Sequence, residues 1–419
     1  MATPLTVERL APGGEGFSRA GPGPVVFVPG GLPGDRVLPE RLERHRGFLR
    51  AVSFRLVTPS PDRVEPPCPF ADACGGCDLM RLARPAQLRA KAELLADALR
   101  RTGRLGAESA PPTVVTAGGD LGYRHRARLH VDAGGRVGFY GRRAHDLVTI
   151  DRCVVCSEPV SAGLAALHAA GPGALGPLES IELRAAPRGT PLVAVGTPRP
   201  GAGAAALRAL TRTLDGLAAV WVAGASNGEA PEQRFPLPGE LELRVGPETF
   251  TQVNWTLNLQ MVRDVVARAV EHGVQGFSDL YAGAGNFALP LLAAGMTGLV
   301  VERSAEAVAR AQASARAAGL SGGEFRVGRA EVVARRLAAE RPGAELVLLD
   351  PPRAGARAAL PGVLAARPRF VALIACDPPT FARDVRTLRE HGYALQELAA
   401  YDLFPHTHHV EAVAWLVRT

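Results

Sequence analysis

Four short apolar runs in the carboxyl-terminal part of the chain alternate with longer segments of helical spacing. Short, mostly apolar runs of this length are typical of parallel strands with both faces covered by helices. The runs are Gly276–Leu280, Gly298–Val301, Leu346–Leu349 and Phe370–Ala375. We therefore predict a doubly wound α/β domain over residues 246–419, with right-handed crossovers. Its ligand should bind beyond the carboxyl ends of these strands.

The first run leads into a glycine turn that opens a helical segment. Asp279 lies near the end of the run, and Gly283 and Gly285 follow as a G-x-G pair. The next run ends at Glu302, about 20 residues on, where a carboxylate can bind the hydroxyls of a ribose. Nicotinamide-binding folds share this spacing, but they carry a third glycine where this chain has Ala288. The pattern favours S-adenosylmethionine and a Rossmann-like class I methyltransferase domain.

Later strand ends carry side chains suited to catalysis. Asp350 is followed by two prolines, which fix an extended backbone that can orient a planar nucleobase. Cys376 ends the last run, and we expect the helix start behind it to lower the pKa of its thiol. A lone cysteine is usually an inert buried thiol, but this position favours a nucleophile. Glu411 interrupts the apolar segment Val410–Val417, where a carboxylate is costly unless it has a function.

The sequence of the amino-terminal half predicts two further domains. Residues 1–59 contain short strand-like runs separated by glycines, which predicts a small basic β-barrel of the oligonucleotide-binding type or a merely structural β domain. The prolines at 59 and 61 mark a boundary. Residues 60–245 form a predicted β-rich central domain that also holds a helix at Arg84–Arg101.

The charge of the chain favours a polyanionic partner. The formal net charge is +7 and the pI is near 9.5, and a positive field raises encounter rates with nucleic acid. Of the 48 basic residues only Lys91 is a lysine, which we attribute to genome composition. In the predicted strand Tyr123–Val131 the alternation puts three basic side chains on one face, which is either an RNA contact or a solvated strand face. They are Arg124, Arg126 and Arg128.

Cysteines are clustered in the central domain. Cys68, Cys74 and Cys77 lie within ten residues, and Cys153 follows a strand-like segment that can bring a fourth thiolate. Four thiolates suit zinc or an iron–sulfur cluster. The x5 spacing argues against a radical S-adenosylmethionine enzyme. Histidines 406, 408 and 409 are a weak zinc candidate, because two of them are adjacent.

These motifs resemble those of the bacterial RNA (uracil-5-)-methyltransferases, specifically the 23S ribosomal RNA branch with an amino-terminal TRAM domain and a 4Fe-4S cluster. The resemblance covers nearly the whole chain. Its segments are Phe27–Gly30, Leu32–Val37, Arg63–Cys68, Cys74–Cys77, Phe250–Asn254, Asp350–Arg353, Cys376–Pro378 and Phe404–Glu411.

The resemblance implies a role for each site residue. Cys376 would attack carbon 6 of the target uracil, and Glu411 would remove the proton from carbon 5. The cluster would be held by Cys68, Cys74, Cys77 and Cys153, which leaves Cys156 as a spare. S-adenosylmethionine would be bound by Gln252, Tyr281, Asn286, Glu302 and Asp350.

The chain departs from the family pattern at four positions without losing either catalytic residue. These are Ala282, Arg329, Ala375 and His406. Arg329 stands where an acid or amide usually contacts the cofactor, so we leave it out of the predicted site.

The resulting prediction is an enzyme that methylates carbon 5 of a uridine in 23S rRNA, with tRNA as the alternative substrate. A redox or radical iron–sulfur enzyme and an RNA-binding scaffold are the alternatives from other classes. The first ten residues lack the pattern of a secretory signal, and no apolar run is long enough to span a membrane. We therefore expect a cytoplasmic protein that acts as a monomer.

Overall fold

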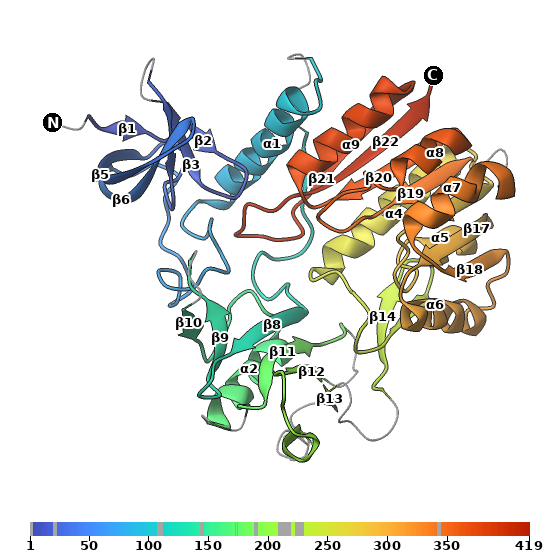
Figure 1. Ribbon diagram of the computed structural model, residues 1–419, viewed down its shortest axis with the longest axis horizontal. Helices are drawn as coiled ribbons and strands as arrows, with labels where there is room; N and C mark the ends of the chain where they lie inside the picture. Colours follow the sequence, from blue (N-terminus) through green and yellow to red (C-terminus); the bar gives the residue numbers. More distant parts are fainter. Residues whose placement is uncertain are drawn as a thin grey trace.

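The computed structural model describes residues 3–19, 23–106, 112–142, 146–171, 173, 175–187, 192–207, 219–222, 230–341 and 345–419. Within these residues the chain forms three larger sheets and a two-stranded one (Figure 1). None of the helices described has the length and apolar character needed to cross a lipid bilayer.

The amino-terminal sheet has six strands in the order β1-β5-β6-β4-β3-β2. The strands are β1 Leu5–Thr6, β2 Arg9–Leu10, β3 Gly16–Arg19, β4 Val25–Val28, β5 Arg36–His45 and β6 Phe48–Thr58. Alternate residues of β4 are buried, as expected when one face of a strand covers a core. The small core of this sheet includes Val7, Val26, Val28, Val37 and Ala51.

The central sheet also has six strands, in the order β10-β9-β8-β11-β12-β13. The strands are β8 Arg126–Val131, β9 Val137–Tyr140, β10 Leu147–Thr149, β11 Leu178–Arg184, β12 Val193–Pro198 and β13 Ala219–Val222. Helix α2, Glu158–Ala169, packs on it through Val160, Leu164 and Leu167. An antiparallel hairpin, β14 Gln233–Leu237 and β15 Leu241–Val245, then leads toward the carboxyl-terminal sheet.

The carboxyl-terminal sheet has eight strands in the order β18-β17-β16-β19-β20-β22-β21-β7. The strands are β7 Val114–Val115, β16 Gly276–Asp279, β17 Thr297–Glu302, β18 Gly323–Val327, β19 Leu346–Leu349, β20 Phe370–Ala375, β21 Tyr393–Tyr401 and β22 Glu411–Arg418. Strands β16 to β20 are parallel, whereas β22 is antiparallel to both of its neighbours. The order reverses next to β16, which is where a ligand binds in open α/β sheets.

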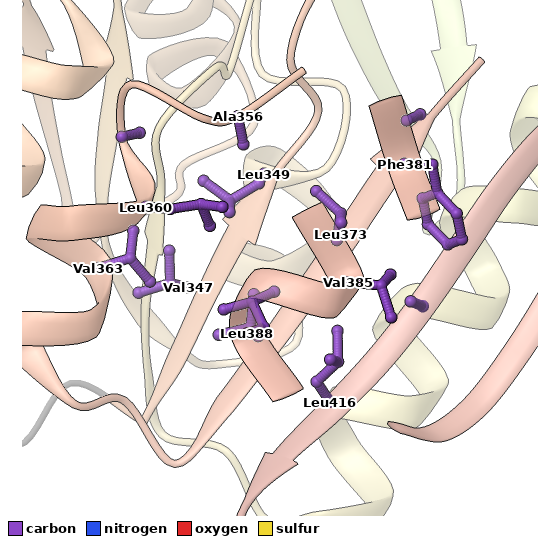
Figure 2. Close-up of a cluster of buried hydrophobic side chains, with 14 of the residues drawn as sticks. Val347, Leu349, Ala356, Leu360, Val363, Leu373, Phe381, Val385, Leu388 and Leu416 are labelled. Carbon is purple, nitrogen blue, oxygen red and sulfur yellow. The ribbon is translucent and has the colours of Figure 1, made fainter. Parts of the chain in front are cut away.

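Helices cover both faces of this sheet (Figure 1). They are α4 Trp255–Glu271, α5 Ala288–Ala293, α6 Ala305–Ala317, α7 Ala330–Glu340, α8 Leu360–Ala366 and α9 Pro378–Glu390. Strand β19 shows why its sequence is apolar throughout: Val347 and Leu349 belong to one buried cluster, and Leu346 and Leu348 belong to another. Figure 2 shows part of the first cluster, in which side chains of α8 and α9 meet those of β19, β20 and β22.

Helix α1, Arg84–Arg101, belongs structurally with the carboxyl-terminal sheet although it precedes the central sheet in sequence. Its Leu95 and Leu99 are buried in the same cluster as α9 and β20. Strand β7 follows α1 and pairs in parallel with β21. The segment 60–245 is therefore not a spatially separate β unit over its whole length, and the domain boundaries drawn above stay a prediction.

Candidate active site

Three predicted site residues, together with Asp279 of the glycine-turn motif, lie at the carboxyl edge of the parallel strands. Asp279 and Glu302 end β16 and β17, while Asp350 and Cys376 directly follow β19 and β20. These strands are adjacent and parallel, so their carboxyl ends lie at the same edge of the sheet. These residues therefore lie at the edge of the sheet where the sequence pattern placed them, and their roles stay a prediction.

Cys376 and Glu411 meet because β22 is inserted antiparallel to β20. In that register Ala375 faces Ala412. One further step along the two strands places Cys376 opposite Glu411, and directly opposed residues of an antiparallel pair project to the same side. The Glu411 carboxylate raises the pKa of the Cys376 thiol, which agrees with this proximity.

The thiol of Cys376 differs from expectation. Burial raises its pKa to about 11, and the neighbouring Glu411 adds to the rise, whereas the Arg353 guanidinium opposes it. Helix α9 does begin beside it, with Asp377 accepting a hydrogen bond of 3.1 Å from the Thr380 amide. The expectation that this helix start lowers the pKa was wrong, because desolvation and a neighbouring carboxyl outweigh the helix dipole.

Three carboxyl groups make the edge electrostatically unusual. Asp279 is fully buried, and among the described residues its carboxylate is approached only by the Tyr281 amide, which lowers its pKa slightly without forming a hydrogen bond of normal geometry. Burial and the nearby Asp350 raise its pKa well above the ordinary value. Burial also raises the pKa of Asp350 to about 7, and burial together with Asp350 raises that of Glu411. Such a cluster favours a cationic ligand, whose charge would offset the repulsion.

The glycine turn is tied to the end of β17. The Gly283 amide donates to Glu302 Oε2 at 3.2 Å, and the Ser304 amide donates to Oε1 at 2.9 Å. Gly285 has a φ of 98°, and a Cβ there would lie 2.9 Å from the Leu289 side chain, so only glycine fits. A Cβ at Gly283 would meet nothing within 4 Å, which leaves open space on that side of the turn.

The remaining predicted cofactor residues, Asn286, Tyr281 and Gln252, have different surroundings. Asn286 exchanges two hydrogen bonds, of 2.9 and 3.0 Å, with the buried Asn258 of α4. Tyr281 is half-buried, and burial raises its pKa to about 12. Gln252 is buried in the segment just before α4.

The segment that holds Gln252 is joined to the start of the central sheet. The His125 amide donates to the Val253 carbonyl at 2.8 Å. Beside this contact, the Arg126 guanidinium lies 4.5 Å from the ring centre of Phe250, whose side chain is 60% exposed. Arg126 therefore covers an aromatic ring, and the predicted basic row is not a purely solvated face. Sequence reasoning included Phe250 only as part of a motif, and its exposure could not be read from the sequence.

The four predicted cluster cysteines influence one another electrostatically. Burial raises the pKa of Cys68, Cys74 and Cys77, and in each case the Cys153 sulfur adds to the rise. The Gly76 amide donates to Cys74 Sγ at 3.4 Å. Among the described residues, however, no group of three or more potential ligands has a ready-made metal-binding arrangement.

Histidines 406, 408 and 409 form no metal-binding group within the described part of the chain, although the rings of His408 and His409 lie 4.2 Å apart. His408 Nδ1 lies 2.6 Å from Asp78 Oδ2, and His409 Nε2 lies 3.4 Å from a nitrogen of Arg353. His406 Nδ1 lies 3.1 Å from Gln87 Nε2.

Comparison with known proteins agrees with this site. The tRNA (Uracil-5-)-methyltransferase family profile matches residues 239–419. A 23S rRNA (uracil(1939)-C(5))-methyltransferase of Acidithiobacillus ferrooxidans is 34% identical over 98% of this chain and 96% of its own length. The enzyme of the same name from Pseudomonas putida is also 34% identical, over 98% of this chain and 92% of its own.

A solved structure extends the likeness to the whole fold. The tRNA (uracil-54, C5)-methyltransferase of Pyrococcus abyssi, determined with S-adenosyl-L-homocysteine, superposes with a TM-score of 0.74 at 24% identity. The match covers 99% of this chain and all of the other, so the two share a fold. The near-full-length similarity to the curated enzymes shows that the chain belongs to the RNA uracil-5-methyltransferase family.

Proposed function

We propose that this enzyme methylates carbon 5 of a uridine in 23S rRNA. The observation that carries the proposal is the register of β20 and β22, which puts Cys376 opposite Glu411 at the carboxyl edge of the sheet. A nucleophile and a base on one side of a substrate ring are what covalent substitution at carbon 5 requires. The choice of 23S rRNA rests on the relatives that match the chain over nearly its full length.

The chain's own groups account for the covalent steps. The Cys376 thiol first loses its proton to solvent. The thiolate then forms a bond to carbon 6, and the electron pair of the C5–C6 double bond moves toward the carbonyl at carbon 4. Carbon 5 thereby becomes nucleophilic enough to accept the methyl group that S-adenosylmethionine would supply, with S-adenosyl-L-homocysteine as the leaving group. Glu411 removes the proton from carbon 5, the double bond re-forms, and the C6–S bond breaks to return the thiolate. Because its pKa is raised, Glu411 is a stronger base once ionised.

The buried acids and the open glycine turn fit S-adenosylmethionine. This cofactor supplies an electrophilic methyl group and carries positive charge. The fully buried carboxyl groups of Asp279 and Asp350, whose pKa values burial raises, mark the place where a cation is favoured. Glu302 would hold the ribose beside Gly283, while Gln252, Tyr281 and Asn286 would complete the binding site.

Labelled S-adenosylmethionine tests this function directly. We expect label in 5-methyluridine of 23S rRNA lacking the modification, and none with Cys376→Ala. Label in tRNA alone would favour the alternative substrate, which the description of the family profile suggests. If neither RNA acquires 5-methyluridine, the proposed function is wrong and a redox enzyme or an RNA-binding scaffold is the better interpretation.

We further propose that Cys68, Cys74, Cys77 and Cys153 hold a 4Fe-4S cluster with a structural role. The support is chemical: the donors are all cysteines, and three of them pack against the buried Met80, Tyr123, Val155 and Val253. Protein purified without oxygen should be brown and contain about four irons, and Cys77→Ser should lose them. Cys156→Ser is the matched control that should keep them. A single zinc without colour would overturn this assignment.

The other units complete the proposal. Residues 1–59 would be a TRAM barrel that binds RNA, residues 60–245 the cluster-bearing domain, and residues 246–419 the catalytic domain. We expect a monomer in the cytoplasm, where its proposed substrate is made. Unstacking the target uridine costs a few kcal/mol, so RNA contacts outside the catalytic domain are needed to offset it.

A further inference from the structure

Lys91 is the single lysine among 48 basic residues, and its side chain is completely buried. It lies in the middle of α1. Genome composition explains the arginines elsewhere, but it does not explain why lysine remains at this position. An ammonium is compact, whereas a guanidinium is a larger planar fork, so a closed site for a small charge favours lysine.

The Lys91 ammonium binds the beginning of the loop that joins β21 to β22. It forms an ion pair with Asp402 Oδ1 and donates to the Phe404 carbonyl at 2.9 Å. Asp402 is also buried, and its other carboxylate oxygen accepts a hydrogen bond from Arg84. Arg84 lies two turns before Lys91 on the same face of α1. Two cations of one helix thus hold one carboxylate of the loop.

The rest of this loop, residues 402–410, is held from the same side. The His406 amide donates to Gln87 Oε1 at 3.0 Å, and its carbonyl accepts from the Leu79 amide at 2.9 Å. Tyr123 donates its hydroxyl hydrogen to the Pro405 carbonyl at 3.1 Å, and the His408 amide donates to Asp78 Oδ1 at 3.1 Å.

The backbone conformation of the loop needs such support. His406 has a φ of 65°, in the left-handed region that is costly for a residue with a Cβ. Such conformations persist only where surrounding contacts determine them. The loop ends at Val410, which is fully buried, and Glu411 follows directly.

We propose that Lys91 is a positioning residue, which fixes the 402–410 loop on α1 and thereby sets the carboxylate of Glu411 for proton removal. The inference rests on the proposed role of Glu411. A buried ion pair adds little net stability, because desolvation cancels most of its attraction, but it does specify one arrangement of the groups around it. The loop is the connection between β21 and β22, and its position decides where β22 begins.

The test separates positioning from stability. Lys91→Met should slow release of the methylated RNA, because the covalent intermediate forms but Glu411 is misplaced. We expect turnover to fall about tenfold or more while denaturation-resistant enzyme–RNA adduct accumulates, with the Kd of S-adenosylmethionine unchanged. Arg89→Met is the matched control, because Arg89 lies on the exposed side of the same helix and its ion-pair partner, Asp62, lies in the segment before α1.

Two further variants make every outcome informative. Asp402→Asn removes the charge but keeps the shape and the contact to Arg84, so it supplies the measurement if Lys91→Met does not fold. Lys91→Met/Asp402→Asn leaves no unpaired buried charge and should recover the thermal midpoint, yet the adduct should still accumulate. Recovery of turnover together with stability would show a merely structural pair and overturn the inference.

Glu411→Gln is the reference for trapping. If Glu411→Gln accumulates adduct and the folded Lys91 and Asp402 variants do not, positioning by Lys91 is wrong while the role of Glu411 stands. If Glu411→Gln itself turns over normally without adduct, the assigned base is wrong, and the inference about Lys91 falls with it.

Discussion

At the scale of single residues, the site combines groups whose ionisation is unfavourable in the free protein. Asp279, Asp350 and Glu411 are carboxyl groups with raised pKa values, and Cys376 is a thiol with a raised pKa. Burial is the first cause in every case. A site of this kind favours a charged ligand, because ionisation of its buried groups stays unfavourable until an opposite charge binds beside them.

Asp279→Asn should stabilise the free protein and weaken cofactor binding. The folded-state pKa of Asp279 lies above its unfolded value, so its contribution is most favourable below the unfolded pKa and is lost as pH rises through the folded one. The variant should therefore gain about 1 kcal/mol or more over the wild type in urea unfolding at pH 8, and less at pH 5. Asp62→Asn is the control, because the Asp62 carboxylate is partly exposed and already paired with Arg89. Equal gains at both pH values would contradict the burial argument.

Alkylation of Cys376 should respond in opposite directions to its two charged neighbours. Glu411 raises the pKa of the thiol and Arg353 lowers it. At pH 8, Glu411→Gln should speed modification by iodoacetamide and Arg353→Met should slow it, each by about threefold to tenfold, since the thiolate is the reacting form. Mass spectrometry of the peptide containing Cys376 gives the rates. A rate that is independent of both substitutions would show that neither group acts on the sulfur.

At the scale of elements, helix α9 supports the nucleophile. Phe381, Val385 and Leu388 are fully buried and point toward β20 and β22 (Figure 2). The same cluster contains Leu95 and Leu99 of α1, so one core holds the strand before Cys376 and the helix that carries Lys91. The position of the nucleophile therefore depends on the packing of two helices, α1 and α9, that lie far apart in the sequence.

Leu388→Ala should destabilise the protein by about 2–5 kcal/mol, because it leaves a cavity in this core. The measurement is the free energy of unfolding in urea. Arg386→Ala on the same helix removes only a partly exposed ion pair with Glu390 and should cost about 0.5 kcal/mol or less. Similar losses for the two variants would mean that the face of α9 is assigned wrongly.

At the scale of the whole molecule, three parts of the chain meet at the 402–410 loop. Gly14 of the amino-terminal sheet approaches Asp78 and His408 so closely that a Cβ would clash with both. Leu10 and Leu32 of that sheet pack with Leu79 and with α1. The amino-terminal sheet is thus fastened to the segment that holds the loop, and its β5–β6 hairpin projects at the opposite end (Figure 1).

Replacing Arg44, Arg46 and Arg55 by alanine should weaken RNA binding without changing the Kd of S-adenosylmethionine. All three are exposed on or beside β5 and β6, and none forms an ion pair within the described residues. If each contacts a phosphate, the slope of log K against log salt should fall by about 2 to 3. Arg316, Arg335 and Arg336, exposed on α6 and α7, provide a triple alanine control of equal charge. An unchanged salt slope would exclude this hairpin from the RNA-binding surface.

Local sequence was sufficient for the elements and for the kind of chemistry. Leu346–Leu349 and Phe370–Ala375 are strands with the predicted bounds, and α1 spans the predicted Arg84–Arg101. These segments are specified by their own apolar spacing and by a proline at the helix start, which act over a few residues. Parallel strands also bring their carboxyl ends together, so the edge that holds Asp350 and Cys376 followed from the pattern alone.

Tertiary structure decided what those residues face. The antiparallel insertion of β22 puts Glu411 opposite Cys376. Burial, with Glu411 adding to it, reverses the expected direction of the thiol pKa. Long-range packing also brings Lys91, which the sequence shows only as a residue in the middle of a helix, into contact with the start of the loop before Glu411. No local pattern contains these contacts, because Lys91 and Asp402 are 311 residues apart in the chain and their charges become partners only after folding removes both from water.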